Sequence, residues 1–504
     1  MQLLAQRWTP DRLDPHNMGL VRVNNAIPHT NGFSVARDFS AITSSLPDKV
    51  VGATFGRKPT GTEVLFAGTA SGLYRLLGDN ATWCDVSPSG SSFMNVNSWE
   101  FSQVDNLILA TGKTQGVYSF NLDGNTGACD DSRELFVALS GDPPKADYIS
   151  SFRQFTVLGG IEDYPSRLQW SGFNNATLWS PSRFTQSDFQ DLPSRNGKVQ
   201  ALVPGNYMVV FQEKSIHIMS YVGPPTVFRF DEVDLERGTD APLSVCSTGE
   251  TIFFHSGDGF FRLDGGRQLT PIGEDRVDKW LEDNVSHILS LRGVVDPENH
   301  AVFWSFDGRG GGRYTHILVY RWDVDSWGLI EQEHDYAVAA PAFSQTLDAA
   351  AFNDLYGNNI DGSYQVSFDS PLWLSGRLNL RLFNEDHKMG SLSGVPKQAV
   401  FESGYRMIGR GGYHKIIGVT PIVGDLGTYN PEADQTVRVD VRDRIQQRTA
   451  SDSQVRSLNK WGNADIHLRG SYFKIRTTLT GGFHGFSGWD YDATPDGLRG
   501  RAIR

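Results

Sequence analysis

A short phrase of two strands separated by a glycine turn recurs along the chain and limits what it can fold into. The stretch SGDGFFRLDGGRQLTPIG, residues 256–273, joins a glycine turn, an aromatic strand, a second glycine turn and a further apolar run. Similar phrases are TASGLYRLLGDNATWCDVS, residues 69–87, and KTQGVYSFNLDG, residues 113–124. Runs of Val, Phe, Tyr and Leu between glycines are typical of short β-strands. We therefore predict an all-β chain.

The spacing of these phrases predicts a β-propeller. Tyr74 and Tyr118 are 44 residues apart, and comparable strand triplets return near residues 207–234, 251–273 and 300–333. A period in the forties with three or four strands per unit is typical of propeller blades. We expect Tyr74, Tyr118, Phe261 and Tyr320 to be packing residues between blades. The alternative is a sandwich whose hairpins are similar by accident.

The blade count is six or seven. Six segments are candidate blade starts: VVGATFGR, VNSWEFSQV, DYISSFRQF, KVQALVPGN, APLSVCSTGE and LRGVVDPEN. Residues from YAVAAPAFSQ to KQAVFES have weaker repeat character and supply either a seventh blade or closing strands. Only EDRVDKWLEDNVSHILSL, residues 274–291, has clear helical spacing.

The sequence predicts three regions. Residues 1–44 form an N-terminal arm with closing strands, residues 45–400 the propeller, and residues 401–504 a C-terminal β domain. In that last region Val437, Val439 and Val441 alternate with charged residues, as in a half-buried strand. Residues 401–504 carry 15 Lys and Arg against 11 Asp and Glu, whereas the whole chain carries 46 against 58. This asymmetry suggests different surroundings for the two ends.

Motifs for catalysis, cofactors or metals are missing from the sequence. Phosphate-binding glycine loops, HExxH, GxSxG and EF-hand patterns do not occur. The Ser-x-Asp-x-Gly-x-Thr-Trp turn of sialidase-type propellers does not occur either. Cys84, Cys129 and Cys246 are scattered, so we expect three buried thiols rather than disulfides. We expect no enzymatic activity, cofactor or metal site. The start, MQLLAQRWTP, predicts neither a signal peptide nor membrane insertion.

Several long phrases resemble a family of bacteriophage structural proteins. They are LQWSGFNNATLWSPSRFTQSDFQDLPSRNGKVQALVPGN and the residues after it, FFHSGDGFFRLDGGRQLTPIGEDRVDKW, NAIPHTNGFSVARDFSAI and RGSYFKIRTTLTGGFHGFSGWDYDATPDGLRGR. Together they resemble the packaged-DNA stabilisation or tail nozzle proteins of short-tailed phages, over most of the chain.

The resemblance implies a structural virion protein of the phage tail, made in the host cytoplasm. It implies a homo-oligomer, a hexameric ring below the portal and adaptor, with tail fibre, spike or needle proteins beside or below. The ring would extend the DNA channel, retain packaged DNA and release it on infection. Double-stranded DNA would pass through without sequence-specific binding. An acidic channel is compatible with such passage because it does not grip phosphates.

With this resemblance, the charge division makes Arg438, Arg442 and Arg444 candidate inter-subunit or docking contacts. Two other functions remain open. One is a propeller tail protein that binds a receptor or binds or hydrolyses glycans, which requires carboxylates and aromatics clustered at one propeller mouth. The other is a cellular propeller scaffold, which would be monomeric.

Overall fold

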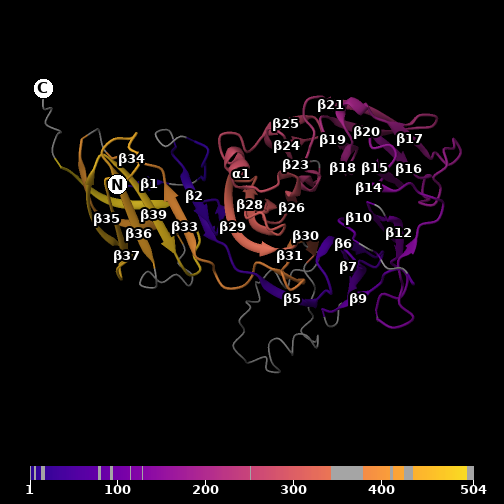
Figure 1. The fold of residues 1–504 in the computed structure, drawn as a ribbon, viewed down its shortest axis with the longest axis horizontal. Helices are drawn as coiled ribbons and strands as arrows, with labels where there is room; N and C mark the ends of the chain where they lie inside the picture. The colour runs from indigo at the N-terminus through magenta and orange to yellow at the C-terminus, as the bar shows by residue number, and fades with distance from the viewer. Residues whose placement is uncertain are drawn as a thin grey trace.

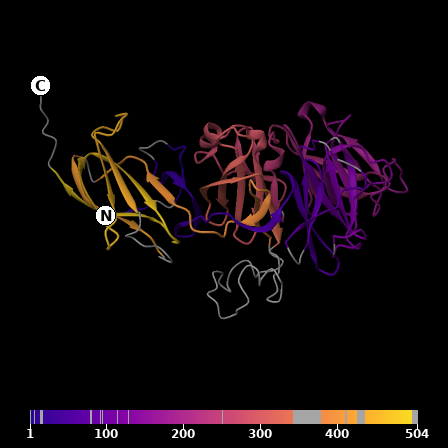
Figure 2. The ribbon, with the colours of Figure 1, turned by 60° about the horizontal axis from the view of Figure 1, so that its bottom comes forward.

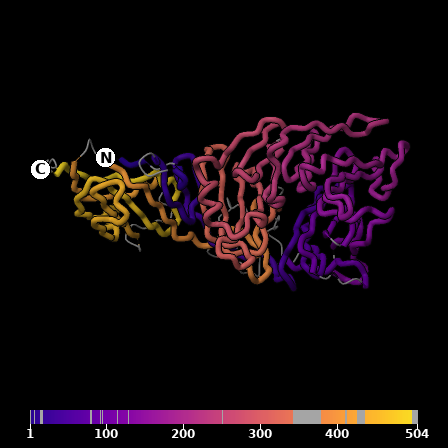
Figure 3. Tube along the Cα trace, turned by 45° about the horizontal axis from the view of Figure 1, so that its top comes forward, coloured from indigo at the N-terminus to yellow at the C-terminus, as the bar shows by residue number. Residues whose placement is uncertain are grey.

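The chain folds into a body of seven consecutive antiparallel sheets and a smaller sandwich made from its two ends (Figure 1). The computed structural model describes residues 2–4, 7–12, 17–77, 81–90, 93, 95–113, 115–127, 129–249, 251–341, 378–408, 412–424 and 435–496. Strands predominate throughout these residues, which confirms the all-β prediction. The sandwich lies at one end of an elongated molecule (Figures 2 and 3).

Four strands in sequence order form each of the first five sheets. Sheet 1 consists of β6 (Val50–Arg57), β7 (Glu63–Thr69), β8 (Leu73–Leu76) and β9 (Trp83–Asp85). Sheet 2 consists of β10 (Trp99–Val104), β11 (Leu107–Gly112), β12 (Gly116–Asn121) and β13 (Val137–Ala138). Sheet 3 consists of β14 (Ala146–Phe152), β15 (Phe155–Ile161), β16 (Arg167–Trp170) and β17 (Asp188–Asp191). Sheet 4 consists of β18 (Val199–Val203), β19 (Met208–Gln212), β20 (Ile216–Gly223) and β21 (Val227–Asp234). Sheet 5 consists of β22 (Cys246–Thr248), β23 (Thr251–Ser256), β24 (Gly259–Asp264) and β25 (Gln268–Pro271).

The N-terminal arm completes the last two sheets of this seven-sheet body. Sheet 6 consists of β26 (Arg292–Asp296), β27 (Ala301–Phe306), β28 (Tyr314–Arg321) and β29 (Ser326–His334), extended by the hairpin β3 (Ala26–His29) and β4 (Gly32–Val35). Sheet 7 consists of β30 (Tyr336–Pro341), β31 (Leu378–Phe383), β32 (Lys388–Ser391) and, at its outer edge, β5 (Ser40–Ser45). Sheets 6 and 7 therefore each pair strands that are more than 290 positions apart in the sequence.

The first strands of the sheets contact one another in a cycle. β6 contacts β10, β10 contacts β14, and β14 contacts β18. The turn η3 (Pro242–Ser244) contacts β18 and β26, and β22 also contacts β26. The cycle closes because β26 contacts β30 and β30 contacts β6. In Figure 1 these strands surround the centre of the seven-sheet body. Each of the six segments that the sequence marks as blade starts overlaps the first strand of a separate sheet.

Aromatic side chains fill the space between neighbouring sheets. Trp304 of sheet 6 lies against Phe260 of sheet 5, with ring centroids 4.5 Å apart, and its Nε1 donates to Ser244 O at 3.0 Å. Trp327 stacks on Trp304, and its Nε1 donates to Ile272 O at 3.0 Å. Each indole thus buries a large apolar surface while its N–H finds a partner, as buried tryptophans require.

The aromatic residues of the repeated phrase are core residues, as predicted. Phe261 and Tyr320 are buried. Tyr74 and Tyr118 are half-buried and pack against the apolar clusters on either side of sheet 1.

The sandwich is made from both ends of the chain. Its first sheet has the order β1 (Gln2–Leu4), β40 (Gly488–Pro495), β35 (His414–Ile422) and β38 (Ala464–Gly470). Its second sheet has the order β2 (Leu20–Asn24), β33 (Ala399–Ser403), β39 (Tyr472–Leu479), β36 (Thr436–Arg442) and β37 (Asp452–Ser457), with β34 (Arg406–Met407) also paired to β39. The predicted C-terminal domain thus shares its sheets with residues 2–4 and 20–24.

Two local predictions were wrong. Cys84 and Cys129 form a disulfide with Cα atoms 5.7 Å apart, and Cys246 alone remains a thiol. The contact of sheet 1 with the loop before β13 brings these two cysteines together from 45 residues apart, which sequence spacing does not reveal. The helix predicted over residues 274–291 is shorter: α1 spans Asp278–Asn284, and η4 (Ile288–Ser290) follows it. The helix ends because Val285 is extended.

Candidate functional site

A central cavity lies where the first strands of the sheets converge. It has two adjoining parts, about 150 Å³ and about 250 Å³, which share Leu243 and Arg292 in their walls. The smaller part is lined from sheets 2, 3, 4 and 6, and the larger part from sheets 1, 6 and 7 and the segment before β10. A concave site with polar groups arriving from several elements is the usual form of a small-molecule site.

Arg292, the first residue of β26, connects three sheets at this cavity. Its Nε donates to Ala337 O at 2.8 Å, and its Nη2 donates to the Tyr336 hydroxyl. The guanidinium carbon lies 3.7 Å from the centroid of the Tyr336 ring, a cation–π contact. Ala53 N of sheet 1 donates to the same hydroxyl at 3.2 Å. Burial raises the pKa of Tyr336 to about 12, so the phenol is neutral at pH 7.

Glu100 of β10 supplies a carboxyl group to the smaller part of the cavity. Its side chain is half-buried and makes no hydrogen bond or ion pair with the part of the chain that the structure describes. Burial raises the pKa of Glu100, and the charge of Arg292 opposes that rise. Beside it, the Tyr148 hydroxyl donates to Gln200 Oε1 at 3.2 Å. The cavity thus combines a carboxyl, a guanidinium, an amide and phenol hydroxyls.

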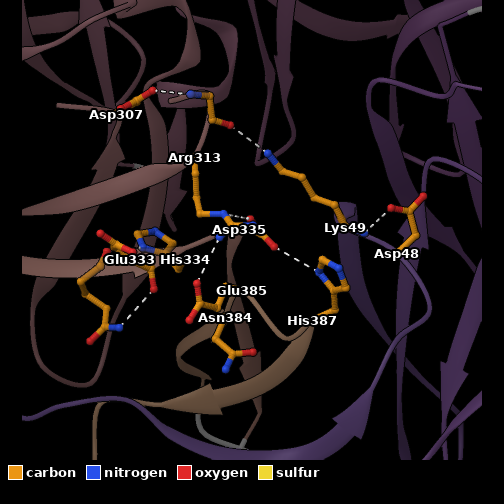
Figure 4. A network of polar contacts seen from close by, with 12 residues as sticks. Asp48, Lys49, Asp307, Arg313, Glu333, His334, Asp335, Asn384, Glu385 and His387 are labelled. Carbon is orange, nitrogen blue, oxygen red and sulfur yellow. Dashed lines mark hydrogen bonds and ion pairs between the residues drawn. The ribbon is translucent and has the colours of Figure 1, made fainter. Parts of the chain in front are cut away.

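A polar network forms the rim of the larger part of the cavity (Figure 4). The buried Asp335 carboxylate accepts contacts from Arg313 Nε at 2.8 Å and His387 Nδ1 at 3.2 Å. Arg313 Nη1 also lies 3.3 Å from Glu385 Oε2. Because Arg313 belongs to the segment before β28 and His387 to the turn before β32, the network joins sheets 6 and 7.

Asp307, on the same rim, fixes the shape of the loop after β27. Its Oδ1 accepts the N–H groups of Arg309 and Gly310 at 2.8 Å, and its Oδ2 accepts that of Gly312 at 2.7 Å. These bonds lower the pKa of Asp307 against the effect of burial. Lys49 Nζ donates to Gly312 O at 3.0 Å. The carboxylates of Asp307 and Asp335 therefore already have partners within the rim, whereas the Glu100 carboxyl has none among the described residues.

The three arginines predicted from the sequence lie in the sandwich, away from the central cavity. Arg438 is in β36, where its Nε contacts Asp440 Oδ1 at 2.8 Å. Arg442, the last residue of β36, lies 3.7 Å from the centroid of the Tyr405 ring and donates to Arg448 O at 3.0 Å. Arg444 is exposed in the turn after the strand; its backbone carbonyl accepts Gln447 N at 3.1 Å, and its side chain has no hydrogen bond or ion pair among the described residues. Arg438 and Arg442 share one face of β36, whereas Arg444 lies beyond it.

That face of the second sandwich sheet is rich in basic side chains. Directly paired positions across the sheet place Arg22, Glu402, Arg476 and Arg438 in one row. Lys474 contacts Glu402 Oε1, and Arg476 Nε lies 3.7 Å from Glu402 Oε2. The opposite face carries Val437, Val439 and Val441, all buried as predicted. We call the seven residues Arg22, Glu402, Arg438, Asp440, Arg442, Lys474 and Arg476 the basic face; five are cationic and two anionic.

The sequence indicated Arg438 and Arg442 of the basic face but not its other cations, nor the central cavity. Glu100, Tyr148 and Arg292 belong to different repeat units, and each is an ordinary alternating residue of a first strand. The available signal was a polar or aromatic residue near the start of a first strand: Glu100 is the second residue of β10, Tyr148 the third of β14 and Arg292 the first of β26.

Asp278 should make stability depend on pH. Burial, then the neighbouring Asp11, Glu274 and Asp258 charges, raise its pKa to about 7, although Phe260 N donates to it at 3.1 Å. An unfolded aspartate has a pKa of about 3.9. The folded state thus holds the proton more tightly, and the contribution of Asp278 to stability is present below pH 4 and lost as pH rises to 7.

We therefore expect Asp278→Asn to match the wild type near pH 4 and to exceed it at pH 8, by up to about 4 kcal/mol. Asparagine keeps the acceptor for Phe260 N. Urea unfolding at both pH values measures the difference, with the exposed Asp283→Asn of the same helix as control. Equal free energies of unfolding for Asp278→Asn and wild type at pH 8 would contradict the expectation.

Comparisons with known proteins add little about function. No family model matches the chain, and no curated protein is similar to it. Among solved structures, the chain is similar to the computationally designed Ika8 protein, with 10% identity, a TM-score of 0.36 and coverage of 70% of this chain and 98% of that one. A chain of the mitotic checkpoint complex has 8% identity, a TM-score of 0.38 and coverage of 72% and 96%. The extracellular domain of the putative one-component system BT4673 from B. thetaiotaomicron has 11% identity, a TM-score of 0.40 and coverage of 84% and 48%. None of these three similarities carries a functional argument.

Within the described residues, no helix has the length and apolar character needed to span a membrane. The same residues contain no group of three or more His, Cys, Asp or Glu side chains placed to hold a metal ion.

Proposed function

We propose that this chain is a structural protein of a phage tail, a nozzle or hub subunit whose seven-sheet body is a seven-bladed β-propeller. Six copies form a ring below the portal and adaptor, extend the DNA channel, retain packaged DNA and let it exit on infection. The propeller assignment is supported by seven sheets in sequence order, the cycle of contacts between first strands, and β5 at the outer edge of sheet 7.

The main observation that supports a structural role is the basic face of the sandwich. It is built from both chain ends and lies at one end of the molecule, apart from most of the seven-sheet body (Figure 2). Its basic face carries five cations against two anions, whereas the whole chain is acidic, with a formal net charge of −12. A ring needs two different complementary patches on each subunit. The basic face of one subunit and an acidic surface of its neighbour, or of the protein above, meet that need.

An enzymatic role has weaker support. Hydrolysis of a glycosidic bond by the usual mechanism needs two available carboxyl groups flanking the bond. Among the described residues that line the central cavity, Asp307 and Asp335 are engaged in the rim, which leaves Glu100 as the one carboxyl group without a partner. We therefore assign assembly rather than enzymatic turnover to this chain.

Native mass spectrometry of the purified full-length protein tests the assembly. We expect a species of six copies, alone or after addition of the portal and adaptor, that dissociates as salt rises because charge pairs across the interface are screened. A protein that stays monomeric in both conditions at micromolar concentration would argue against the ring and favour a monomeric scaffold.

A further inference from the structure

A second pocket, of about 190 Å³, lies between sheets 6 and 7. It opens because β31 pairs with β32 at its Phe383 end, whereas the two strands are apart at residues 379–381. Those residues form one wall, residues 391–393 form another, and sheet 6 supplies the rest. The exposed residues Asn299 and Ser393 line it, so the pocket reaches the surface. Because an apolar cavity of about 150 Å³ holds benzene, this one can hold a ligand of about nine non-hydrogen atoms.

Two hydrogen-bond donors of β31 in this pocket have no acceptor. Arg381 is 3% exposed, and its guanidinium makes no hydrogen bond or ion pair with the described residues; its Nε is fully buried. Asn379 is on the same face of the strand, two positions earlier, and its Nδ2 is also buried without a partner among the described residues. Buried polar groups in a folded chain nearly always have partners. These two donors therefore indicate a place where an acceptor from outside binds.

The charge that this pocket leaves without a counterion is positive. Burial lowers the pKa of Arg381 to about 10, against the opposing effect of the Asp296 charge, so the guanidinium is still protonated at pH 7. Asp296 lines the same pocket, but its carboxylate accepts Asn299 N at 3.1 Å and Asn299 Nδ2 at 2.8 Å. Burial raises the pKa of Asp296, and a bound anion would raise it further, so Asp296 takes up a proton more readily than an ordinary aspartate. Asp296 is therefore a weak competitor for Arg381.

The rest of the lining is mainly apolar and discriminates between anions. Ile27, Phe303, Leu380 and Leu392 line the pocket and belong to one apolar cluster. A doubly charged anion such as sulfate would lose its hydration against these side chains. A carboxylate on an apolar body can instead place its two oxygens on the guanidinium and its body on the apolar wall. A cation would be repelled by Arg381, and a neutral solute would leave the guanidinium without a counterion.

We propose that this pocket binds a small carboxylic acid with an apolar body, whose carboxylate forms an ion pair with Arg381 and accepts a hydrogen bond from Asn379 Nδ2. The apolar body lies against Phe303 and its aliphatic neighbours. This inference goes beyond the proposed tail function and does not depend on it, since it rests on the residues of sheets 6 and 7 alone.

Isothermal titration calorimetry of the full-length protein with sodium benzoate and sodium hexanoate tests the proposal. We expect at least one of them to bind with a dissociation constant below about 10 mM. The neutral counterparts benzamide and hexanamide should bind at least about tenfold more weakly, because only the acids neutralise Arg381. Sodium sulfate at the same ionic strength should not displace the carboxylate. The proposal is overturned if neither carboxylate binds, if the amides bind as tightly, or if sulfate displaces them.

Two substitutions place the binding at this pocket. Arg381→Met keeps the length of the side chain and removes its charge, so carboxylate binding should weaken at least about tenfold while the midpoint of thermal unfolding does not fall. Asn379→Asp supplies a carboxylate from the chain itself, so it should abolish binding and leave the midpoint at or above that of the wild type. Arg267→Met, at an exposed position between β24 and β25, is the matched control and should bind as the wild type does.

The two substitutions also separate a binding defect from a folding defect. If Arg381→Met unfolds early, Asn379→Asp decides, because it keeps the size of the side chain that it replaces. Carboxylate binding of wild-type strength in a folded Arg381→Met or Asn379→Asp variant would show that the ligand binds elsewhere and would overturn the assignment.

Discussion

Removal of residues 1–45 is expected to abolish cooperative folding of the whole chain. The deletion takes away β5, the outer strand of sheet 7, and β1 and β2, which belong to the two sheets of the sandwich. It also removes the core residues Trp8, Leu20 and Phe33, each at most 1% exposed. A domain is stable by only about 5–15 kcal/mol. The stabilisation lost with these strands and their buried apolar area is larger than that, so the remaining chain should not fold cooperatively.

Circular dichroism and urea unfolding of the truncated protein measure this effect.

A single substitution tests the contribution of β5, the outer strand of sheet 7. Thr43 of β5 is buried; its Oγ1 accepts Met389 N at 3.0 Å and Trp83 Nε1 at 3.3 Å, linking sheets 7 and 1. Thr43→Val keeps the shape but leaves both donors unsatisfied, so we expect a loss of about 1–3 kcal/mol. A truncated chain that unfolds cooperatively at the wild-type midpoint would show that the N-terminal strands are dispensable.

Strand content and the start of each sheet could be predicted because they depend on local patterns. The segments VVGATFGR and LRGVVDPEN are short β-branched and apolar runs beside glycine or proline turns, and they contain β6 and β26. Backbone twist and glycine turns act within a few residues, so the sequence displays them directly. The same reasoning located the buried valines of β36.

Contacts between distant segments could not be predicted. Cys84 pairs with Cys129, and Asp11 accepts the N–H groups of Lys279 and Trp280 at the start of α1, across more than 260 residues. Each contact depends on how whole sheets lie side by side. The central cavity is the extreme case, because Glu100, Tyr148 and Arg292 come together only when several sheets share one centre. The repeat length and the amino-acid composition do not indicate which side chains line the central cavity.

Particles that lack this protein are expected to fill with DNA and then lose it. In the proposed role the ring retains the packaged genome, so its absence leaves packaging intact but the exit unsealed. Amber or deletion mutants of the phage, analysed by nuclease protection of encapsidated DNA, test this outcome. Intact and infectious particles without the protein would refute the nozzle assignment.

Charge reversal on the sandwich should impair incorporation into the tail without unfolding the protein. Arg442 is unsuitable as the main target, because its guanidinium packs on Tyr405. Arg444 is exposed and can change sign with little loss of packing, whereas reversal of Arg438, whose side chain is 47% exposed, also removes its ion pair with Asp440, a loss of about 1 kcal/mol. Arg438→Glu with Arg444→Glu would place negative charge against the acidic partner surface. We expect incorporation to fall at least about tenfold, the equivalent of about 1.4 kcal/mol at the interface.

The matched control is Arg183→Glu with Arg195→Glu, the same change of charge outside the sandwich. Arg183 lies in the connection between β16 and β17, and Arg195 lies in the turn η2 (Ser194–Asn196). Both are exposed, and their side chains have no hydrogen bond or ion pair among the described residues. It should enter particles at wild-type stoichiometry, measured by quantitative mass spectrometry of purified virions. Equal midpoints of thermal unfolding for both double variants exclude misfolding as the cause. If the Arg438 and Arg444 variant enters particles normally and these hold their DNA through a salt wash, docking uses another surface, because a charge-dependent contact at the basic face would fail first under those conditions.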